Sequence, residues 1–108
     1  MAWTVETLNA TVDGELDDLP ADMQAKFVKI SELIEELGLE RIGKPYVDHI
    51  QGKLWEIRMK GRDRISRALY VTADVQRVVV VRVFVKKTQK TPKREIDLAL
   101  ERAKEILK

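Results

Sequence analysis

Arginine side chains on predicted strands are the residues of this sequence best suited to do chemistry. Arg58 ends the segment LWEIR, Arg67 lies within RISRALY, and Arg82 interrupts the apolar run VVVVRVFV. A guanidinium group can bind phosphate through two parallel hydrogen bonds and stabilise the negative charge that develops there during reaction. A group of such arginines on the surface of a sheet therefore indicates a site for a phosphodiester.

Arg82 illustrates the two alternatives open to a strand arginine. Strand alternation places it on the face shared by Val80 and Phe84, where an unpaired guanidinium is costly. It either pairs with a carboxylate, for which Glu56 and Asp63 are the candidates, or it opens onto a cleft. For RNA, a cleft offers cleavage by the substrate's own 2′-OH, with arginines stabilising charge and a lysine of lowered pKa accepting the proton.

A second concentration of positive charge is the segment FVKKTQKTPKREI, residues 84–96. It is either a solvated connection or a surface that holds a polyanion. Two of its cations fall in the first turn of a predicted helix, where the helix dipole disfavours positive charge, and this favours an anionic partner. The cations of the segment are Lys86, Lys87, Lys90, Lys93 and Arg94.

Aromatic and histidine side chains supply further candidates. Tyr70, next to the arginine strand, could stack on a base, although its spacing equally fits a core residue. Trp55 is assigned to the core, the alternative being a platform on which a base stacks. His49 has the intrinsic pKa for acid–base catalysis, but the sequence shows no partner for it.

The sequence lacks the residues of several other chemistries. It contains no cysteine and one histidine, which excludes thiolate catalysis and a multi-histidine metal site and favours a reducing cytoplasm. No glycine-rich phosphate loop or GxSxG motif is present, so no metal or other cofactor is expected. No apolar stretch approaches the roughly 20 residues that span a bilayer, and the N-terminus does not resemble a signal peptide, so no membrane association is expected.

The charge is divided unevenly along the chain. Residues 1–40 contain ten acidic and two basic side chains, a net charge of −8, whereas residues 41–108 contain eighteen basic and eight acidic ones, a net charge of +10. The net charge of the 108 residues is therefore only +2. This polarity favours nucleic acid as the partner, the alternative being a well-solvated domain with uneven charges.

The length and the element pattern predict one α+β domain spanning residues 1–108. Hairpin-length connections predict an antiparallel meander whose last strand, apolar on both faces, sits centrally in the sheet, with the N-terminal strand at an edge. Residues 38–52 are expected to form an irregular connection. The predicted strands are 3–8, 53–59, 64–71 and 77–85.

Three helices are predicted to pack with this small antiparallel sheet. A short one covers residues 11–18, and a longer one begins with Pro20 in its first turn and ends at Gly38. Its buried stripe is expected to be Met23, Phe27, Ile30, Ile34 and Leu37. A C-terminal helix is expected to have Thr91 as its N-cap and Pro92 as its first residue, with one face lined by Ile96, Leu100, Ala103 and Leu107.

The blocks LWEIR, RALY and FVKKTQKTP together resemble the RelE/ParE toxin superfamily, specifically its phage-derived HigB-like branch. The resemblance covers nearly the whole chain and implies a RelE-like fold. It also implies a type II toxin that cleaves mRNA on the ribosome without metal and is neutralised by a cognate antitoxin, commonly a helix-turn-helix protein. Because the superfamily includes gyrase-poisoning members, a ParE-like gyrase inhibitor, an inactive antitoxin-binding relic and a plain nucleic-acid-binding module remain alternatives.

The resemblance also indicates site residues by position. Arg67 matches the strand arginine of the family, Arg58 matches a basic strand position, and Lys86 with Lys87 match the basic cluster that closes the last strand. Many relatives have a histidine where this chain has Arg82, so no histidine role transfers there, and the tail after KTP offers no tyrosine. The expected catalytic residues are Arg67, Arg82 and Lys87, and the expected RNA-binding residues are Arg58, Arg64, Tyr70, Lys86, Lys90, Lys93 and Arg94.

Overall fold

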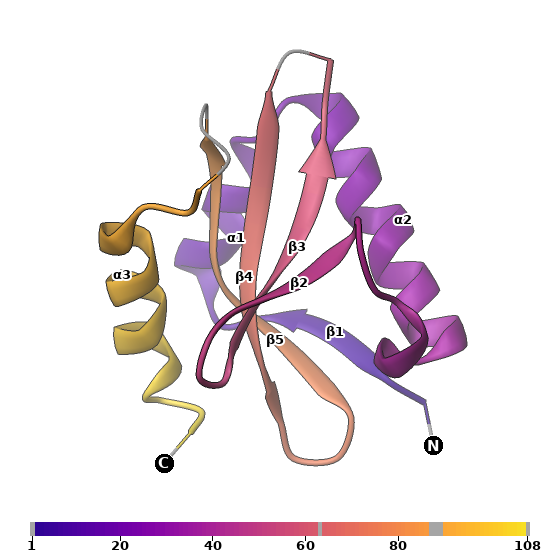
Figure 1. The fold of residues 1–108 in the computed structure, drawn as a ribbon, viewed down its shortest axis with the longest axis vertical. Helices are drawn as coiled ribbons and strands as arrows, with labels where there is room; N and C mark the ends of the chain where they lie inside the picture. The colour runs from indigo at the N-terminus through magenta and orange to yellow at the C-terminus, as the bar shows by residue number, and fades with distance from the viewer. Residues whose placement is uncertain (1, 63, 87–89, 108) are drawn as a thin grey trace.

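A five-stranded sheet forms the middle of the protein, with α2 packed on one face and α3 on the other (Figure 1). The computed structural model describes residues 2–62, 64–86 and 90–107. The sheet order is β1-β5-β4-β3-β2. In chain order the elements are β1 (Thr4–Thr7), α1 (Ala10–Asp17), α2 (Ala21–Leu37), the 3-10 helix η1 (Leu39–Arg41), β2 (Val47–Gln51), β3 (Leu54–Lys60), β4 (Ile65–Ala73), β5 (Arg77–Lys86) and α3 (Lys93–Ala103).

The predicted α+β architecture and the meander are confirmed. Strands β2 to β5 pair antiparallel in sequence order, and β5 is an internal strand. Strand β1 lies at the edge, as expected, but it pairs parallel to β5, so the sheet is mixed. The parallel pairing is possible because two helices and three strands separate β1 from β5 along the chain.

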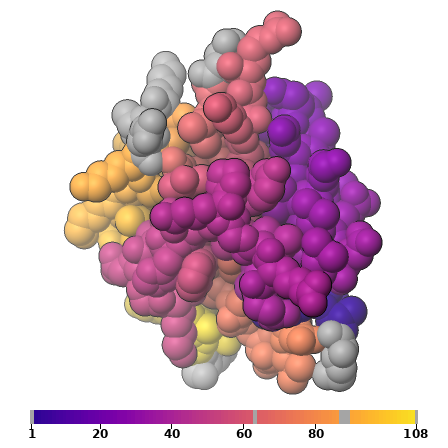
Figure 2. Space-filling model, turned by 45° about the vertical axis from the view of Figure 1, so that its right-hand side comes forward, coloured from indigo at the N-terminus to yellow at the C-terminus, as the bar shows by residue number. Residues whose placement is uncertain are grey.

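The segment 38–52 is more regular than expected, because it contains η1 and the edge strand β2. Only Val47 of β2 is fully buried, and its other residues are exposed or half-buried. The sequence therefore shows no apolar alternation there, and β2 is specified mainly by its pairing with β3. In the space-filling view this magenta segment lies between α2 and the orange segment that leads into α3 (Figure 2).

Helix α2 covers the first face of the sheet. Pro20, expected at the first helical position, is its N-cap, so the helix begins one residue later at Ala21. Gly38 follows its last residue with φ of 91°. Met23, Phe27, Ile30 and Ile34 are buried against the sheet, whereas Leu37 is 44% exposed. Burial of each of these four side chains contributes about 1.5–3 kcal/mol to stability.

Helix α3 covers part of the second face, through Ala99 and Ala103 with Ile96, Leu100 and Leu107 half-buried around them. Pro92, not Thr91, is the N-cap residue, and the helix begins at Lys93. The Thr91 hydroxyl does not cap the helix because it donates a hydrogen bond to Glu56 of β3 instead.

Strand β5 contains a bulge that changes which way its side chains point. Two consecutive residues of β4 lie opposite Arg82 and Val80, so Val81 is the extra residue. Val80 accordingly packs into the core under α2, whereas Phe84 packs into the core under α3. The expectation that Arg82 shares one face with both residues is wrong, because the alternation restarts at the bulge.

Beyond the bulge, side chains bind the backbone N–H and carbonyl groups along the edge of β5. Strand β1 pairs with β5 only as far as Val80. Past that point, a Glu15 carboxylate oxygen accepts a hydrogen bond from the Val83 N–H at 3.1 Å, and Arg102 Nη1 donates to the Val81 carbonyl oxygen at 2.9 Å. Helices α1 and α3 thus supply the partners that a neighbouring strand would otherwise provide.

Arg82 is the centre of an ion network that joins β5 to both helices. It donates to both carboxylate oxygens of Glu95, at 2.7 and 3.2 Å, and its Nη1 lies 2.8 Å from Glu15 Oε2. Arg102 Nη1 also lies 2.8 Å from Glu15 Oε2. The hydrogen bond to Glu95 is the largest cause of the raised pKa of Arg82. Arg82 is therefore paired, with partners other than the two carboxylates considered from the sequence.

Replacing Glu15 by alanine tests this network. The Glu15→Ala variant removes the acceptor of the Val83 N–H and one counter-charge of Arg82 and of Arg102, so we expect the free energy of unfolding to fall by about 2–4 kcal/mol. Urea denaturation measures the change. The control is Glu36→Ala, an exposed glutamate of α2, which should cost less than about 0.5 kcal/mol; equal losses in the two variants would contradict the network.

Candidate nucleic-acid interface

The second face of the sheet carries charged residues next to the area covered by α3. Glu56, Arg58 and Arg67 lie on this face by strand alternation, because Leu54 and Leu69 of the same strands pack under α3. A cleft of about 240 Å³ opens there between strands β2 to β4 and the segment leading into α3. It is lined by Asp48, His49, Ile50, Glu56, Arg58, Arg67, Lys90, Thr91 and Ile96.

Glu56 is the central residue of this cleft. Its side chain is 1% exposed, and one carboxylate oxygen accepts hydrogen bonds from Arg67 Nη1 and from Arg58 Nε, the latter at 2.8 Å. The other oxygen accepts from the Thr91 hydroxyl at 3.1 Å. Such charge-assisted bonds offset the cost of burying a carboxylate, and they fix the direction of both guanidinium groups.

The register of the sheet brings the two arginines together. Arg58 and Arg67 lie directly opposite each other on β3 and β4. Two like charges in this position repel unless an anion lies between them, and Glu56 supplies that anion. On the neighbouring strand β2, Asp48 Oδ2 lies 3.2 Å from Arg58 Nη2 and holds its outer end.

Lys86, at the end of β5, is a buried lysine close to these arginines. Its side chain is 5% exposed, and its ammonium group has no hydrogen-bond partner among the described residues. The pKa of Lys86 is lowered to about 8, chiefly by burial and also by the charges of Arg67 and Arg58, while the charge of Glu56 opposes the shift. Lys86, expected from the sequence to bind RNA, is thus a buried lysine whose pKa is lowered towards neutrality.

The cleft collects three of the expected site residues, one catalytic and two RNA-binding, with a fourth beside it. Arg58, Arg67 and Lys90 line it, and Lys86 is coupled to the two arginines by charge. Lys87 lies outside the described residues. His49 also lines the cleft, with its Nε2 donating to the Gly52 carbonyl oxygen at 2.8 Å.

The remaining cations lie elsewhere. Arg64 is exposed at the β3–β4 hairpin, and Lys93 and Arg94 are exposed on the first turn of α3, where Lys93 pairs with Asp97 at 2.9 Å. Arg82 is held in the network with α1 and α3 described above, which leaves it a structural role. These four residues do not line the cleft.

Tyr70 takes the core position that was one of its two alternatives, whereas Trp55 is more exposed than expected. Tyr70 is fully buried on the α2 face of the sheet, so its ring has no surface for stacking on a base in the cleft. Trp55, assigned to the core from the sequence, is 39% exposed. It lies near the start of β3, opposite Tyr70 on β4 and opposite His49 on the edge strand β2, which was not predicted from the sequence.

Glu56, Asp48 and Thr91 are the site residues that sequence reasoning missed. Glu56 had a signal, because it lies two residues before Arg58 and so shares its strand face. Asp48 belongs to the unpredicted strand β2, and Thr91 has the type and spacing of a helix cap. Their common feature is that each completes the hydrogen bonding of an arginine or of Glu56 across elements distant in sequence.

Among the described residues, no group of His, Asp and Glu side chains is arranged to hold a metal ion. In the same part of the chain, no helix is long and apolar enough to cross a bilayer.

Substitution of Lys86 by methionine tests whether its buried ammonium group destabilises the folded protein. The variant keeps the apolar stem and removes a buried, unpartnered charge, so we expect the free energy of unfolding at pH 7 to rise by about 1–3 kcal/mol. The gain should shrink as pH rises from about 8 towards the ordinary lysine value of 10.5, because the folded wild type then holds a neutral lysine while the unfolded chain still binds the proton. Thermal unfolding across this pH range measures it, and a destabilised variant at pH 7 would contradict the burial penalty.

Comparisons with known proteins place the fold and the family. The model of the family "Phage derived protein Gp49-like (DUF891)" matches residues 14–104. The structure of a double mutant of the Escherichia coli toxin RelE in the free state is similar with a TM-score of 0.65 and 17% identity, over 94% of this chain and 98% of that one. The archaeal RelE–RelB complex from Pyrococcus horikoshii OT3 is similar with a TM-score of 0.57 and 17% identity, over 83% of this chain and 100% of that one.

No curated protein sequence is significantly similar to the chain. The two structural likenesses confirm the expected RelE-like fold, and the family model confirms the expected phage-derived branch. The chain belongs to the phage-derived Gp49-like family and has the fold of the toxin RelE.

Proposed function

We propose that this protein is the toxin of a type II toxin–antitoxin pair and that it cleaves mRNA on the ribosome without a metal ion. The observation that carries the proposal is the cleft lined by Arg58, Arg67 and Lys90, in which Glu56 binds both arginines. A toxin RelE with the same fold supports the toxin assignment. The HigB-like, ribosome-dependent character follows from the resemblance found in the sequence.

Arg67 and Arg58 are the groups that would hold the scissile phosphate. Glu56 fixes both guanidinium groups before substrate arrives, so little reorganisation is needed to meet the charge that develops on the phosphoryl oxygens. Lys90, which is exposed at the rim, is placed to contact the neighbouring backbone. Within the lining, three cations face two carboxylates, which leaves the cleft attractive to a polyanion.

The reaction we propose is attack of the 2′-oxygen on the adjacent phosphorus. The P–O5′ bond breaks as the new P–O2′ bond forms, which yields a 2′,3′-cyclic phosphate and a 5′-hydroxyl end. Neutral Lys86 accepts the proton of the 2′-OH, and the leaving 5′-oxygen takes a proton from solvent. Because its pKa is lowered to about 8, a useful fraction of Lys86 is neutral near physiological pH.

The partners follow from the same assignment. The P. horikoshii structure is a complex of RelE with RelB, and by analogy we propose a cognate antitoxin for this chain, with a helix-turn-helix protein as the expected type. Ribosome-bound mRNA places the activity in the cytoplasm. The alternatives, a ParE-like gyrase inhibitor or an inactive relic that only binds its antitoxin, require no RNA cleavage and are separated by the experiment below.

The Lys86→Met variant separates catalysis from stability. Purified protein is added to a translation reaction, and the ends of the translated mRNA are mapped. We expect the variant to fold, to bind its antitoxin as the wild type does, and to cleave about 10²–10⁴-fold more slowly, because the proton acceptor is lost. The matched control, Lys104→Met, changes a lysine that is 75% exposed on the C-terminal segment and should cleave normally.

Unchanged cleavage by Lys86→Met would remove Lys86 from the mechanism. Intact mRNA with wild-type protein that is toxic in cells would remove the nuclease itself, and inhibition of gyrase supercoiling by the same sample would establish the ParE-like alternative.

The pH dependence of cleavage gives an independent check on Lys86. The neutral amine is the active form, so the rate should rise about tenfold per pH unit below the pKa of about 8 and level off above it. Single-turnover rates on an RNA substrate between pH 6 and 9 measure the profile. A rate that falls over this range would contradict a lysine base.

A further inference from the structure

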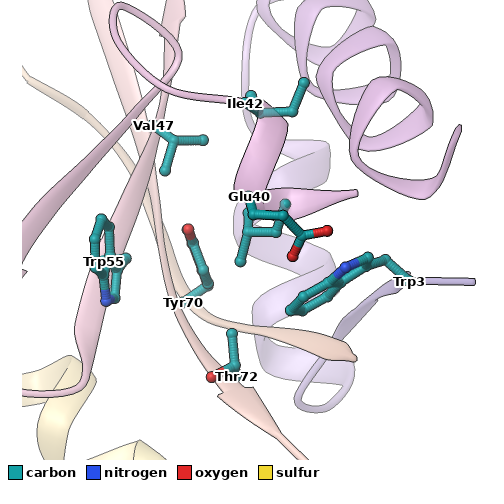
Figure 3. Close-up of a pocket in the computed structure, with 8 residues that line it drawn as sticks. Trp3, Glu40, Ile42, Val47, Trp55, Tyr70 and Thr72 are labelled. Carbon is teal, nitrogen blue, oxygen red and sulfur yellow. The ribbon is translucent and has the colours of Figure 1, made fainter. Parts of the chain in front are cut away.

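A second cavity, of about 410 Å³, lies on the opposite face of the sheet from the cleft. It is bounded by η1, by the residue that precedes β1, and by β2, β3 and β4. Three of its lining residues are aromatic, namely Trp3, Trp55 and Tyr70, and aliphatic side chains of η1 and β2 complete the walls. Figure 3 shows Trp55 on one side of the cavity, Trp3 with Glu40 on the other, and Tyr70 between them.

Tyr70 brings an unsatisfied polar group into this cavity. Its side chain is fully buried, its hydroxyl has no hydrogen-bond partner among the described residues, and Figure 3 shows the hydroxyl pointing into the space between Val47 and Glu40. Burial raises the pKa of Tyr70, so the hydroxyl keeps its proton. The buried indole N–H of Trp3 likewise has no partner in the described part of the chain. Each such group left unpaired costs about 1–3 kcal/mol, which a ligand could recover.

The electrostatics of the cavity favour a cation. Among the described residues that line it, Glu40 is the only charged one. The cavity also lies next to the C-terminal end of α2, where the helix dipole is negative, where Glu35 and Glu36 add charge, and where the last turn has no basic residue. Arg41 of η1 is exposed and does not line the cavity.

We propose that this cavity binds the guanidinium group of an arginine side chain presented by a protein partner. Its plane would stack against an indole ring, and its N–H groups would donate to Glu40 and to the lone pairs of the Tyr70 oxygen. The main chain that carries the arginine supplies a carbonyl acceptor for the Trp3 N–H. Identification of the partner as the antitoxin rests on the proposed function, whereas the chemistry of the cavity does not.

A titration with small arginine derivatives tests the cavity directly. The two tryptophans of the chain both line it, so intrinsic fluorescence reports occupancy. We expect Nα-acetyl-arginine methylamide to bind with a millimolar Kd. The citrulline analogue, which has nearly the same shape but no charge, should bind at least tenfold more weakly. Equal affinity for the two probes would overturn the proposal. So would a fluorescence that does not change at arginine-probe concentrations up to 50-fold above about 1 mM.

Two variants test how much Glu40 and Tyr70 each contribute to binding of the arginine probe. Glu40→Gln removes the counter-charge and should weaken the arginine probe about five- to tenfold, and Tyr70→Phe removes one hydroxyl and should weaken it about threefold or more. Tyr70→Phe should also melt no lower than the wild type, because it deletes an unpartnered buried group. The controls are Glu36→Gln and Tyr46→Phe, exposed residues outside the cavity lining; weakening by the controls alone would overturn the assignment.

The same variants separate this proposal from the nuclease. Glu40→Gln should weaken the complex with the antitoxin while leaving mRNA cleavage by the free protein unchanged, because the cavity and the cleft lie on opposite faces. A wild-type protein that binds the arginine probe but does not cleave mRNA would count against the proposed function alone. A wild-type protein that cleaves mRNA but does not bind the probe would count against the cavity alone.

Discussion

The buried carboxylate of Glu56 is the group on which the arrangement of the cleft depends. It lies between two arginines that the β3–β4 register places opposite each other, and it also accepts a hydrogen bond from the segment leading into α3. Without this carboxylate the two guanidinium groups would repel each other and the start of α3 would lose a tie to the sheet. One side chain thus links the architecture of the sheet to its positive surface.

A comparable arrangement exists at the other side of α3, with a different result. There Glu15 and Glu95 hold Arg82, and Glu15 also holds Arg102. Glu15 accepts from, and Arg102 donates to, the backbone along the edge of β5 that β1 does not reach. Both sites pair arginine with carboxylate, and the Glu56 site also lines a cleft to which Arg58, Arg67 and Lys90 contribute positive charge. Arginines on adjacent strands that are equivalent by sequence pattern therefore have different surroundings, because Arg82 is held between two helices whereas Arg67 lines the cleft.

Much of this protein could be predicted from sequence, and the failures have identifiable causes. The meander, the α2 stripe from Met23 to Ile34 and the place of Arg67 on a strand were accessible because they depend on local sequence pattern, whereas Leu37 is exposed. The strand β2 and the bulge at Val81 were not, because the first is specified by its partner strand and the second by a register shift. Consequently the partners of Arg82 and the face occupied by Tyr70 became visible only in three dimensions.

Analysis of the RNA ends at the cut site tests the central claim, attack by the substrate's 2′-OH at the arginine cleft. The account predicts a 2′,3′-cyclic phosphate, or the 3′-phosphate to which it hydrolyses, together with a 5′-hydroxyl, and no cleavage at a 2′-deoxynucleotide placed at the cut position. A 3′-hydroxyl with a 5′-phosphate, or undiminished cleavage at the deoxynucleotide, would contradict it.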